Sequence, residues 1–486
     1  MLKVESLSYR HAHSDRLALK DVSFSLDEGQ SMLLAGRSGS GKSTLLSVLA
    51  GLVPHFLKGA LAGRAELDGR EAGAGGVAEW GRGARLMLQN SEAQFLAGTV
   101  GEEILLTLRC RGVIGPEAGE IARERLAALG LSALKDQSVF KLSEGQKQKA
   151  VLAALTALRP KLLLLDEPSA NLDPVFLEEL KKALWRLRED GLALIVADHR
   201  PYWLKGLCRK LLVLDDGAVA YEGQIEDLAD QERRSRLGLR SPDVPEKPSL
   251  PPPSGFRRRA PEEEAGFNGT DGSDQAADSG GEIRIENLYF NYPGGPELFG
   301  GLSLTLAYGE VTALTGPSGR GKTTLARLLC GLEKPARGRI TYDGQPAGLE
   351  LAQVVLQNAD HQLYMPTVLS EVILAVGAGG RTPEVEAGAR ELLASFGLLG
   401  LASRHPQSLS GGEKQRLVVA LGLARPTKLL ALDEPTSGLD GQNLALMAAQ
   451  ITKAAQAGPA VLLVTHDLEL VGLCAARHLE LFGPMT

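Results

Sequence analysis

Two short glycine-rich segments of this chain carry a lysine followed by a hydroxyl residue at identical spacing. Residues 36–44 read GRSGSGKST and residues 316–324 read GPSGRGKTT, and both fit the pattern GxxxxGK[ST]. Glycines let successive backbone N–H groups turn inward around phosphate oxygens, and a helix that follows points its positive end at them. Each segment follows an apolar run and precedes a leucine-bearing stretch. The sequence therefore predicts two nucleotide sites.

Within these loops, Lys42 and Lys322 are predicted to reach the β and γ phosphates, while Ser43 and Thr323 offer a hydroxyl to Mg²⁺. The remaining loop residues predicted to contact the nucleotide are Gly36, Ser38, Gly39, Ser40, Gly41 and Thr44, and Gly316, Ser318, Gly319, Arg320, Gly321 and Thr324.

Two acidic pairs end apolar runs further along the chain. Asp166-Glu167 follows LLLL and Asp433-Glu434 follows LLAL. Adjacent carboxylates at the end of a buried strand are costly unless a metal or a polar network meets them. We interpret Asp166 and Asp433 as Mg²⁺ partners, and Glu167 and Glu434 as general bases that activate the attacking water.

His199 and His466 each follow a short apolar run and lie 267 residues apart, as the acidic pairs do. Because phosphoryl transfer depends mostly on positioning and charge stabilisation, a role in holding the γ-phosphate and the water is expected for both. The other six histidines have no counterpart in the opposite half of the chain.

All of these motifs belong to a tandem repeat. The glycine loops are 280 residues apart, the segments LQNSEAQFLAGTV and LQNADHQLYMPTV are 268 apart, and LSEGQKQK and LSGGEKQR are 267 apart. Two colinear copies of one domain are predicted, at 1–240 and 282–486. Residues 241–281 hold seven prolines and blocks of like charge, which predicts a solvated, flexible linker.

Short apolar runs interleaved with helical patterns predict a buried parallel sheet in each copy, and hence an α/β fold. Residues 32–35, 162–165 and 192–197 are such runs, and Val22, Phe24 and Leu26 alternate as in a half-buried strand. Ser143 and Ser410 stand three residues before Gln146 and Glu413, which predicts capping boxes that begin helices.

Composition excludes several classes of function. The net charge of −6 argues against wholesale coating of nucleic acid or anionic membrane. The four cysteines form no CxxC pair, which fits a reducing compartment without a zinc cage or a disulfide framework. The first residues lack the apolar core of a signal peptide, and the apolar runs are far shorter than the ~20 residues that span a bilayer. Any membrane role is therefore expected to be peripheral.

Taken together, the motifs resemble those of the ATP-binding cassette (ABC) ATPases, in both halves of the chain apart from the linker. The resemblance implies two P-loop domains, each with a RecA-like parallel-sheet core, an antiparallel β subdomain and a helical signature subdomain. It implies ATP and Mg²⁺ as cofactors, and two cassettes that close head to tail as an intramolecular pseudo-dimer. Each ATP is then held by the glycine loop of one copy and the LSGGQ signature of the other.

Further site residues are implied by this resemblance alone. They are the Gln-loop residues Gln89 and Gln357, in catalysis and at the metal, the signature residues Ser143, Gly145, Ser410 and Gly412, and the adenine-side residues Tyr292 and His11. Two of these motifs depart from the family pattern. Copy one carries Glu144 where the family prefers glycine, so the site formed by Lys322 and Ser143 is predicted to be the weaker or slower one. His11 replaces an aromatic residue, so stacking there is predicted to be weaker or supplied by Tyr9.

The pattern QNxxxQ followed by TVxxE resembles the ATPases of energy-coupling factor (ECF) transporters, which import vitamins or transition-metal ions. The matching residues are Gln89, Asn90, Gln94 and Glu103, and Gln357, Asn358, Gln362 and Glu371. The implied partners are a transmembrane scaffold (T-type) subunit and a substrate-binding membrane subunit, with the ATPase at the cytoplasmic face of the cell membrane and no nucleic acid bound. Two alternatives remain: a soluble tandem ABC ATPase that acts on ribosomes or nucleic acid, and the ATPase of a conventional ABC importer.

Overall fold

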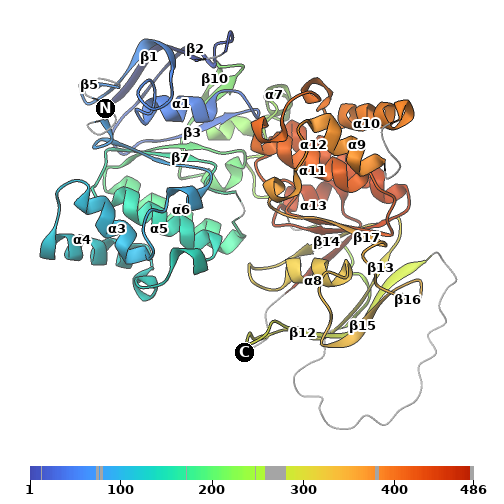
Figure 1. The fold of residues 1–486 in the computed structure, drawn as a ribbon. Helices are drawn as coiled ribbons and strands as arrows, with labels where there is room; N and C mark the ends of the chain where they lie inside the picture. Colours follow the sequence, from blue (N-terminus) through green and yellow to red (C-terminus); the bar gives the residue numbers. More distant parts are fainter. Residues whose placement is uncertain are drawn as a thin grey trace. The chain divides into compact units, whose positions relative to one another are not determined.

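The computed structural model describes residues 1–12, 14–72, 76, 80–170, 172–246, 248–257, 281–377 and 382–481. The chain divides into two compact units, which are described separately (Figure 1). The first comprises Met1–Pro245 with Gly438–Gln442, and the second comprises Glu246–Ser437 with Asn443–Thr486.

The first unit contains the strands β1 (Leu2–His11), β2 (Leu19–Leu26), β3 (Ser31–Gly36), β4 (Gly59–Leu67), β5 (Arg70–Glu71), β6 (Ala84–Met87), β7 (Leu162–Asp166), β8 (Ala193–Ala197), β9 (Lys210–Asp215) and β10 (Ala218–Gln224). Its α-helices are α1 (Lys42–Leu49), α3 (Val100–Arg109), α4 (Gly115–Ala128), α5 (Glu144–Thr156), α6 (Pro174–Glu189) and α7 (Gln231–Leu237).

Two sheets form in this unit. An antiparallel sheet has the order β2-β1-β4-β5, and a second sheet has the order β10-β9-β3-β8-β7-β6, in which β9, β3, β8, β7 and β6 are parallel. Successive side chains of a strand point to opposite faces of its sheet. On β7, Leu162 and Leu164 pack in one core cluster with α1 and the antiparallel sheet, whereas Leu163 and Leu165 pack in the other with α3 to α6. The parallel strands are thus covered on both faces, as the continuous apolar runs predict.

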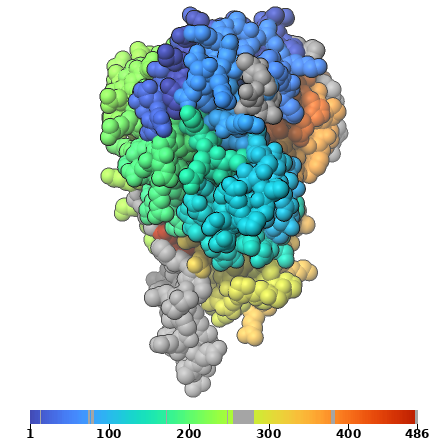
Figure 2. Space-filling view, turned by 90° about the vertical axis from the view of Figure 1, so that its left-hand side faces the viewer, coloured from blue at the N-terminus to red at the C-terminus, as the bar shows by residue number. Residues whose placement is uncertain are grey.

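The layers of this unit are visible in both views. In Figure 1, α1 lies between the antiparallel sheet and β3 and β7, with α3, α5 and α6 on the far side. In the space-filling view of Figure 2, the N-terminal strands (blue) form the upper part of the unit's surface, and the segment that contains α3 and α4 (cyan) bulges below them.

The second unit repeats this plan. Its strands are β11 (Ser254–Arg257), β12 (Glu282–Asn291), β13 (Glu297–Ala307), β14 (Val311–Thr315), β15 (Arg337–Tyr342), β16 (Gln345–Pro346), β17 (Ala352–Val355), β18 (Leu429–Asp433), β19 (Ala460–Val464) and β20 (Arg477–Glu480). Its α-helices are α8 (Lys322–Leu329), α9 (Val368–Val376), α10 (Pro383–Ser395), α11 (Gly411–Leu423), α12 (Gly441–Gln456) and α13 (Leu468–Cys474). The parallel order β17-β18-β19-β14-β20 matches β6-β7-β8-β3-β9. Among the described residues of both units, no helix combines the length and the apolarity needed to cross a bilayer.

The prediction of a wholly solvated linker over 241–281 is wrong for part of that stretch. Strand β11 pairs antiparallel with β13 and adds an edge to the antiparallel sheet of the second unit, and the carbonyl of Pro251 accepts a hydrogen bond from the backbone N–H of His478 (3.0 Å). The four residues of β11, SGFR, include no proline, so the proline count of the whole stretch did not exclude pairing by this short segment. The rest of the stretch, 258–280, lies outside the described residues.

Candidate functional site

Each glycine loop connects a central parallel strand to the helix that follows it. The first lies between β3 and α1, and the second between β14 and α8. Gly36 has a φ of 147°, and a Cβ there would lie 2.3 Å from the carbonyl oxygen of Leu214; at Gly316 the φ is 134°, and the same atom of Leu481 would lie 2.3 Å away. Only glycine fits these two positions, because any side chain would meet rigid backbone. Both glycine loops thus have a backbone that requires glycine at the first position of the motif.

The two loop lysines lie over their own loops. Lys42 Nζ donates to the carbonyls of Gly36 (2.9 Å) and Arg37 (3.0 Å), and Lys322 Nζ donates to the carbonyl of Gly316 (2.7 Å). Burial lowers the pKa of Lys42, while Glu167 and Asp166 act in the opposite direction. The hydrogen bonds to the loop carbonyls hold each ammonium at the N-terminal end of its helix. The backbone N–H groups at this helix end also favour an anion.

Both acidic pairs sit at the ends of their strands, with the glutamate in an unusual backbone conformation. Glu167 has a φ of 48° and Glu434 has a φ of 49°, both in the left-handed region that non-glycine residues rarely adopt. Their backbone N–H groups donate to the carbonyls of Ala197 (2.8 Å) and Val464 (2.9 Å) on the neighbouring strand. Strain of this kind persists only where surrounding structure enforces it, and it gathers at functional sites.

In the first unit, the carboxylate of Glu167 joins two of the predicted residues. Gln89 Nε2 donates to its Oε2 (2.8 Å), and His199 Nε2 lies 3.3 Å from its Oε1. Burial raises the pKa of this carboxyl, but the hydrogen bond and charge of His199 outweigh that effect, so the pKa lies below its ordinary value. Glu167 is therefore held ionised and aimed between the Gln loop and the histidine.

In the second unit, Glu434 has a different set of neighbours. Its Oε2 accepts from Thr465 Oγ1 (3.2 Å) and from the backbone N–H of His466 (3.4 Å), and His466 Nε2 lies 3.7 Å from its Oε1. The described contacts include no hydrogen bond between Gln357 and Glu434. The structure thus brings His466 to the carboxylate but not the Gln-loop side chain.

Each aspartate of the acidic pairs faces the hydroxyl residue of its own loop. Thr323 Oγ1 donates to Asp433 Oδ2 (2.7 Å), and Ser43 is hydrogen-bonded to Asp166. The Oδ1 atom of Asp166 is buried and has no hydrogen-bond partner within the described part of the chain. A hydroxyl, a carboxylate and an unused carboxylate oxygen at a phosphate loop are the oxygen ligands that Mg²⁺ prefers. The residues present therefore fit Mg²⁺.

Asp166 is expected to destabilise the protein when no metal is present. Burial, and next the charge of Glu167, raise its pKa from 3.8 to about 6. A folded-state pKa above the unfolded value stabilises the fold at low pH, and this contribution is lost as pH rises through about 6. Asp166→Asn should therefore raise the stability of the magnesium-free protein above pH 7 by about 3 kcal/mol, the equivalent of about two pKa units, and have little effect at pH 4.

Thermal unfolding in a chelating buffer at both pH values measures this effect, with the exposed Asp136→Asn as control. A stability gain from Asp166→Asn that is the same at pH 4 and pH 8 would contradict the assignment, because only an ionisation difference makes the gain depend on pH.

The signature motifs begin α5 and α11 with the predicted capping boxes. Ser143 and Gln146 exchange side-chain and backbone hydrogen bonds, and Ser410 and Glu413 do the same. Gly145 lies close to α6, and a Cβ at this position would lie 2.4 Å from the Phe176 ring. Gly412 is buried in the first turn of α11. In the first unit, α5 packs on the sheet face opposite to α1, so the signature is separated from the glycine loop of its own unit by the sheet.

Glu144 does not project into solvent from the first turn of α5. Its Oε1 accepts a hydrogen bond from Ser91 Oγ (2.8 Å), a nearly fully buried hydroxyl two residues after Gln89, and Lys147 Nζ lies 3.8 Å from its other oxygen. In the second copy the corresponding residues are Gly411 and Ala359, so neither partner is present. The carboxylate thus links the signature helix of the first unit to its Gln loop.

The aromatic residues expected near the adenine occupy unequal positions. Tyr292 is 37% exposed, and its hydroxyl lies 3.3 Å from Thr324 Oγ1 on α8, whereas His11 is exposed. Tyr9, the alternative predicted for the first copy, is fully buried, and its hydroxyl donates to the carbonyl of Lys58 (3.0 Å). Tyr9 is therefore a core residue, and the prediction that it supplies stacking is wrong.

Thr465 is a site residue that the sequence did not reveal. Its counterpart in the first copy is Asp198, which accepts from Ser169 Oγ (2.8 Å) and Trp203 Nε1 (3.2 Å) instead of contacting the glutamate. The two halves differ in residue type here, so the internal comparison that found the other site residues gave no signal. Adjacency to the repeated histidine was the one available clue.

Comparison with known proteins agrees with this geometry. The family model described as ABC transporter matches residues 19–170 and 299–437. A Treponema denticola protein named as a candidate ABC transporter ATP-binding protein is 31% identical over 492 residues, which cover 99% of this chain and 96% of that protein. A Bacillus subtilis protein named as the candidate HMP/thiamine import ATP-binding protein YkoD is 34% identical over 510 residues, covering 99% of this chain and 90% of that protein.

Among solved structures, one titled RNase-L Inhibitor is similar with a TM-score of 0.65 and 21% identity, covering 99% of this chain and 88% of that chain. At this identity the likeness concerns the fold. The paired glycine loops, acidic strand ends and capped signature helices, together with the family match over more than half of its length, place the chain in the ABC transporter family, as an ATP-hydrolysing protein with two tandem ABC nucleotide-binding domains.

Proposed function

We propose that this protein is the ATP-hydrolysing energy-coupling subunit of an ECF-type importer. It would bind a transmembrane scaffold (T-type) subunit and a substrate-binding membrane subunit at the cytoplasmic face of the membrane, and drive uptake of a vitamin or a metal ion. Support comes from the Gln-loop pattern, which both copies carry, and from the relative named for HMP/thiamine import.

The observation that carries the proposal is the build of the first Gln loop. Gln94 Oε1 accepts from the backbone N–H of Leu88 (2.8 Å), and Glu103 Oε2 accepts from those of Leu96 (2.9 Å) and Ala97 (2.8 Å). The motif residues Gln94 and Glu103 thus stabilise the backbone conformation of the loop. The side chain that this backbone presents is Leu96, which is 82% exposed. A large, exposed apolar side chain on a loop whose backbone is held by Gln94 and the buried Glu103 fits a docking surface.

The second Gln loop has the same build. Gln362 Oε1 accepts from the backbone N–H of Leu356 (3.1 Å), and Glu371 Oε1 accepts from those of Tyr364 and Met365. Tyr364 is 78% exposed. Leu96 and Tyr364 are thus equivalent exposed side chains on the two Gln loops, as expected for a partner that contacts both cassettes.

At the chemical centre, we assign Glu167 and Glu434 as general bases that take a proton from the attacking water. Gln89 would orient Glu167 and the water, and His199 and His466 would hold the γ-phosphate. Ser43 and Asp166, and Thr323 and Asp433, would hold Mg²⁺, with Gln89 and Gln357 completing its shell. When bound, the ion would supply positive charge that offsets the negative charge of the phosphate groups.

The loop residues Lys42 and Lys322 would bind the same oxygens from the helix side. The signature serines Ser143 and Ser410 would complete the site of the opposite copy, so that each ATP is held by both cassettes. Closure of the two cassettes on ATP would then move the parts of the membrane partner that are bound to them.

Affinity purification of the full chain from membranes tests the proposed function. An integral protein with several spans is expected to co-purify, and the double variant Leu96→Asp, Tyr364→Asp should lose it because a charge cannot enter an apolar contact without cost. Ile114→Asp, at a 68% exposed apolar residue outside the Gln loops, is the matched control. Co-purification of ribosomes instead, with hydrolysis stimulated by RNA, would favour the soluble tandem ABC alternative.

The contact of Glu144 with Ser91 predicts how the first signature behaves. With Glu167→Gln disabling the other site, Glu144→Gly should lower the remaining ATP turnover about fivefold, because a hydrogen bond to a buried hydroxyl is worth ~1 kcal/mol. Glu144→Gln keeps an acceptor for Ser91 and should stay within twofold. If charge alone mattered, both variants would raise turnover, and steady-state kinetics distinguishes these outcomes.

A further inference from the structure

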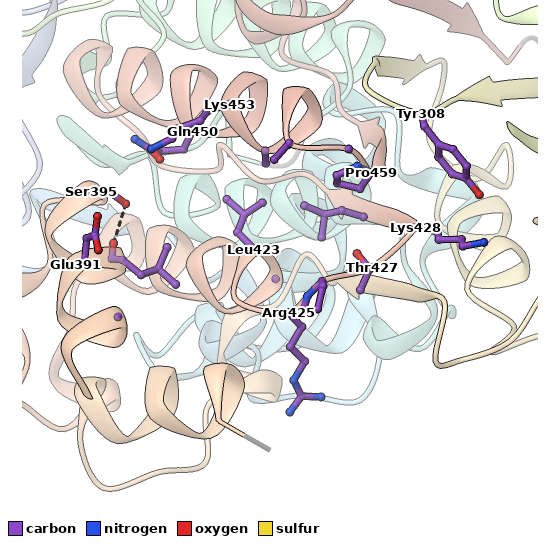
Figure 3. A pocket seen from close by; sticks show the side chains of 18 residues that line it. Tyr308, Glu391, Ser395, Leu423, Arg425, Thr427, Lys428, Gln450, Lys453 and Pro459 are labelled. Atoms are coloured by element: carbon purple, nitrogen blue, oxygen red, sulfur yellow. Dashed lines mark hydrogen bonds between the residues drawn. The ribbon is translucent and has the colours of Figure 1, made fainter. Parts of the chain in front are cut away.

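The second unit contains a cavity of about 720 Å³ that none of the motif residues lines (Figure 3). Its walls come from α10, α11 and α12 and from the segment that leads into β18. That segment is the N-terminal end of the strand, whereas Asp433 and Glu434 lie at the opposite end. The volume falls within the range of small-molecule sites.

Three positions that line the cavity hold smaller residues than their counterparts in the first copy. The 267-residue offset relates α4, α5 and α6 to α10, α11 and α12. Across it, Gly388, Gly422 and Ala454 correspond to Ile121, Leu155 and Leu187. In the first unit these three large side chains pack against the core. The second copy therefore opens a space that the same fold fills elsewhere in the same chain.

The lining combines apolar walls with a mainly cationic rim. Leu392, Leu423, Leu430 and Pro459 line the cavity, together with the cations Arg425, Lys428 and Lys453 and the single acid Glu391.

The three cations of the rim differ in their interaction partners. Lys428 pairs with Asp343 (2.5 Å), and Arg425 Nε donates to the carbonyl of Ala375 (3.1 Å). Lys453 is exposed and has no ion pair among the described contacts, and Figure 3 shows it beside Gln450 at one end of the cavity.

The rim also differs from its counterpart in the first unit. There Glu124, at the position of Glu391, forms an ion pair with Arg159 (3.4 Å), which joins α4 to the segment before β7. In the second unit the arginine of the equivalent segment, Arg425, bonds to Ala375 instead. Among the described contacts, Glu391 and Arg425 form no ion pair that would join α10 to the segment before β18.

We propose that this cavity is a binding site for a small amphipathic anion, with an aliphatic or aromatic body on the apolar walls and one carboxylate at Lys453. The apolar body of the ligand would occupy the space that larger side chains occupy in the first copy. The net positive charge of the rim would favour an anionic head group. Such a ligand would contact the signature helix α11 and the core helix α12 together, at a place separate from the nucleotide loops.

The test uses calorimetric titration of the full chain with decanoate at submicellar concentration. Decanoate is expected to bind at one site, decanol about tenfold more weakly, and decylammonium not measurably. Gly388→Ile with Ala454→Leu restores the larger residue types of the first copy and should abolish binding. A Cβ at Gly388 meets nothing within 4 Å, so this pair should fold, which thermal unfolding verifies.

Lys453→Gln should weaken decanoate binding about fivefold, while Arg186→Gln, the equivalent change on α6, should leave it unaltered. Lys42→Met with Lys322→Met should also leave it unaltered, which separates this site from nucleotide binding. Absence of decanoate binding, equal binding of decylammonium, or undiminished binding by the folded cavity-filling variant would each overturn the proposal.

Discussion

Replacing Glu167 and Glu434 together by glutamine is expected to lower steady-state ATP hydrolysis at least ~100-fold while ATP binding is retained. Glutamine keeps the shape of the side chain and can still contact Gln89 or Thr465, but a carboxamide cannot accept the proton of the attacking water. Because both residues are held in left-handed backbone conformations by neighbouring strands, the substitution should not move them.

Phosphate release at saturating ATP measures this loss, and retention of nucleotide on the purified double variant measures binding. The exposed Glu120→Gln on α4 is the control and should hydrolyse ATP normally. Wild-type turnover in the double variant would remove the assignment of both general bases and would require another group to take the proton.

Methionine at Lys42 or Lys322 is expected to remove one of two ATP-binding events, and both changes together should remove both. Each ammonium is buried above its loop, where a charge-assisted hydrogen bond to phosphate contributes about 1.5–3 kcal/mol, or roughly 10–150-fold in affinity. Methionine preserves the apolar stem and removes only the charge.

The number of ATP molecules bound per chain, from titration with MgATP, checks this expectation. Lys182→Met, at an exposed lysine of α6, is the control and should leave two sites. Two full-affinity sites in the double lysine variant would show that the glycine loops do not carry the nucleotide.

Much of the fold could be predicted because its signals are local or repeated. The apolar runs 32–35 and 162–165 became the buried strands β3 and β7, since a strand covered on both faces needs continuous apolar residues. Ser143 and Ser410 became N-caps because their hydrogen bonds span only three residues. The glycine, acidic and histidine motifs were found because each occurs twice in one order.

Long-range packing decided what the sequence left open. Tyr9 looked available for stacking, yet its ring is buried because alternation along β1 points it at the core. The edge pairing of β11 was hidden by the prolines of the surrounding stretch, which indicated a solvated linker although the strand itself, SGFR, contains none.

By itself the sequence determined that two nucleotide loops, two acidic pairs and two capped signature helices are present, because each depends on residue types at fixed short spacing. Only the tertiary structure decided that Glu144 turns to Ser91, that Thr465 reaches Glu434, and that three small residues on three helices enclose a cavity. These contacts join residues tens of positions apart, and no local pattern in a single chain encodes which side chains meet across such distances.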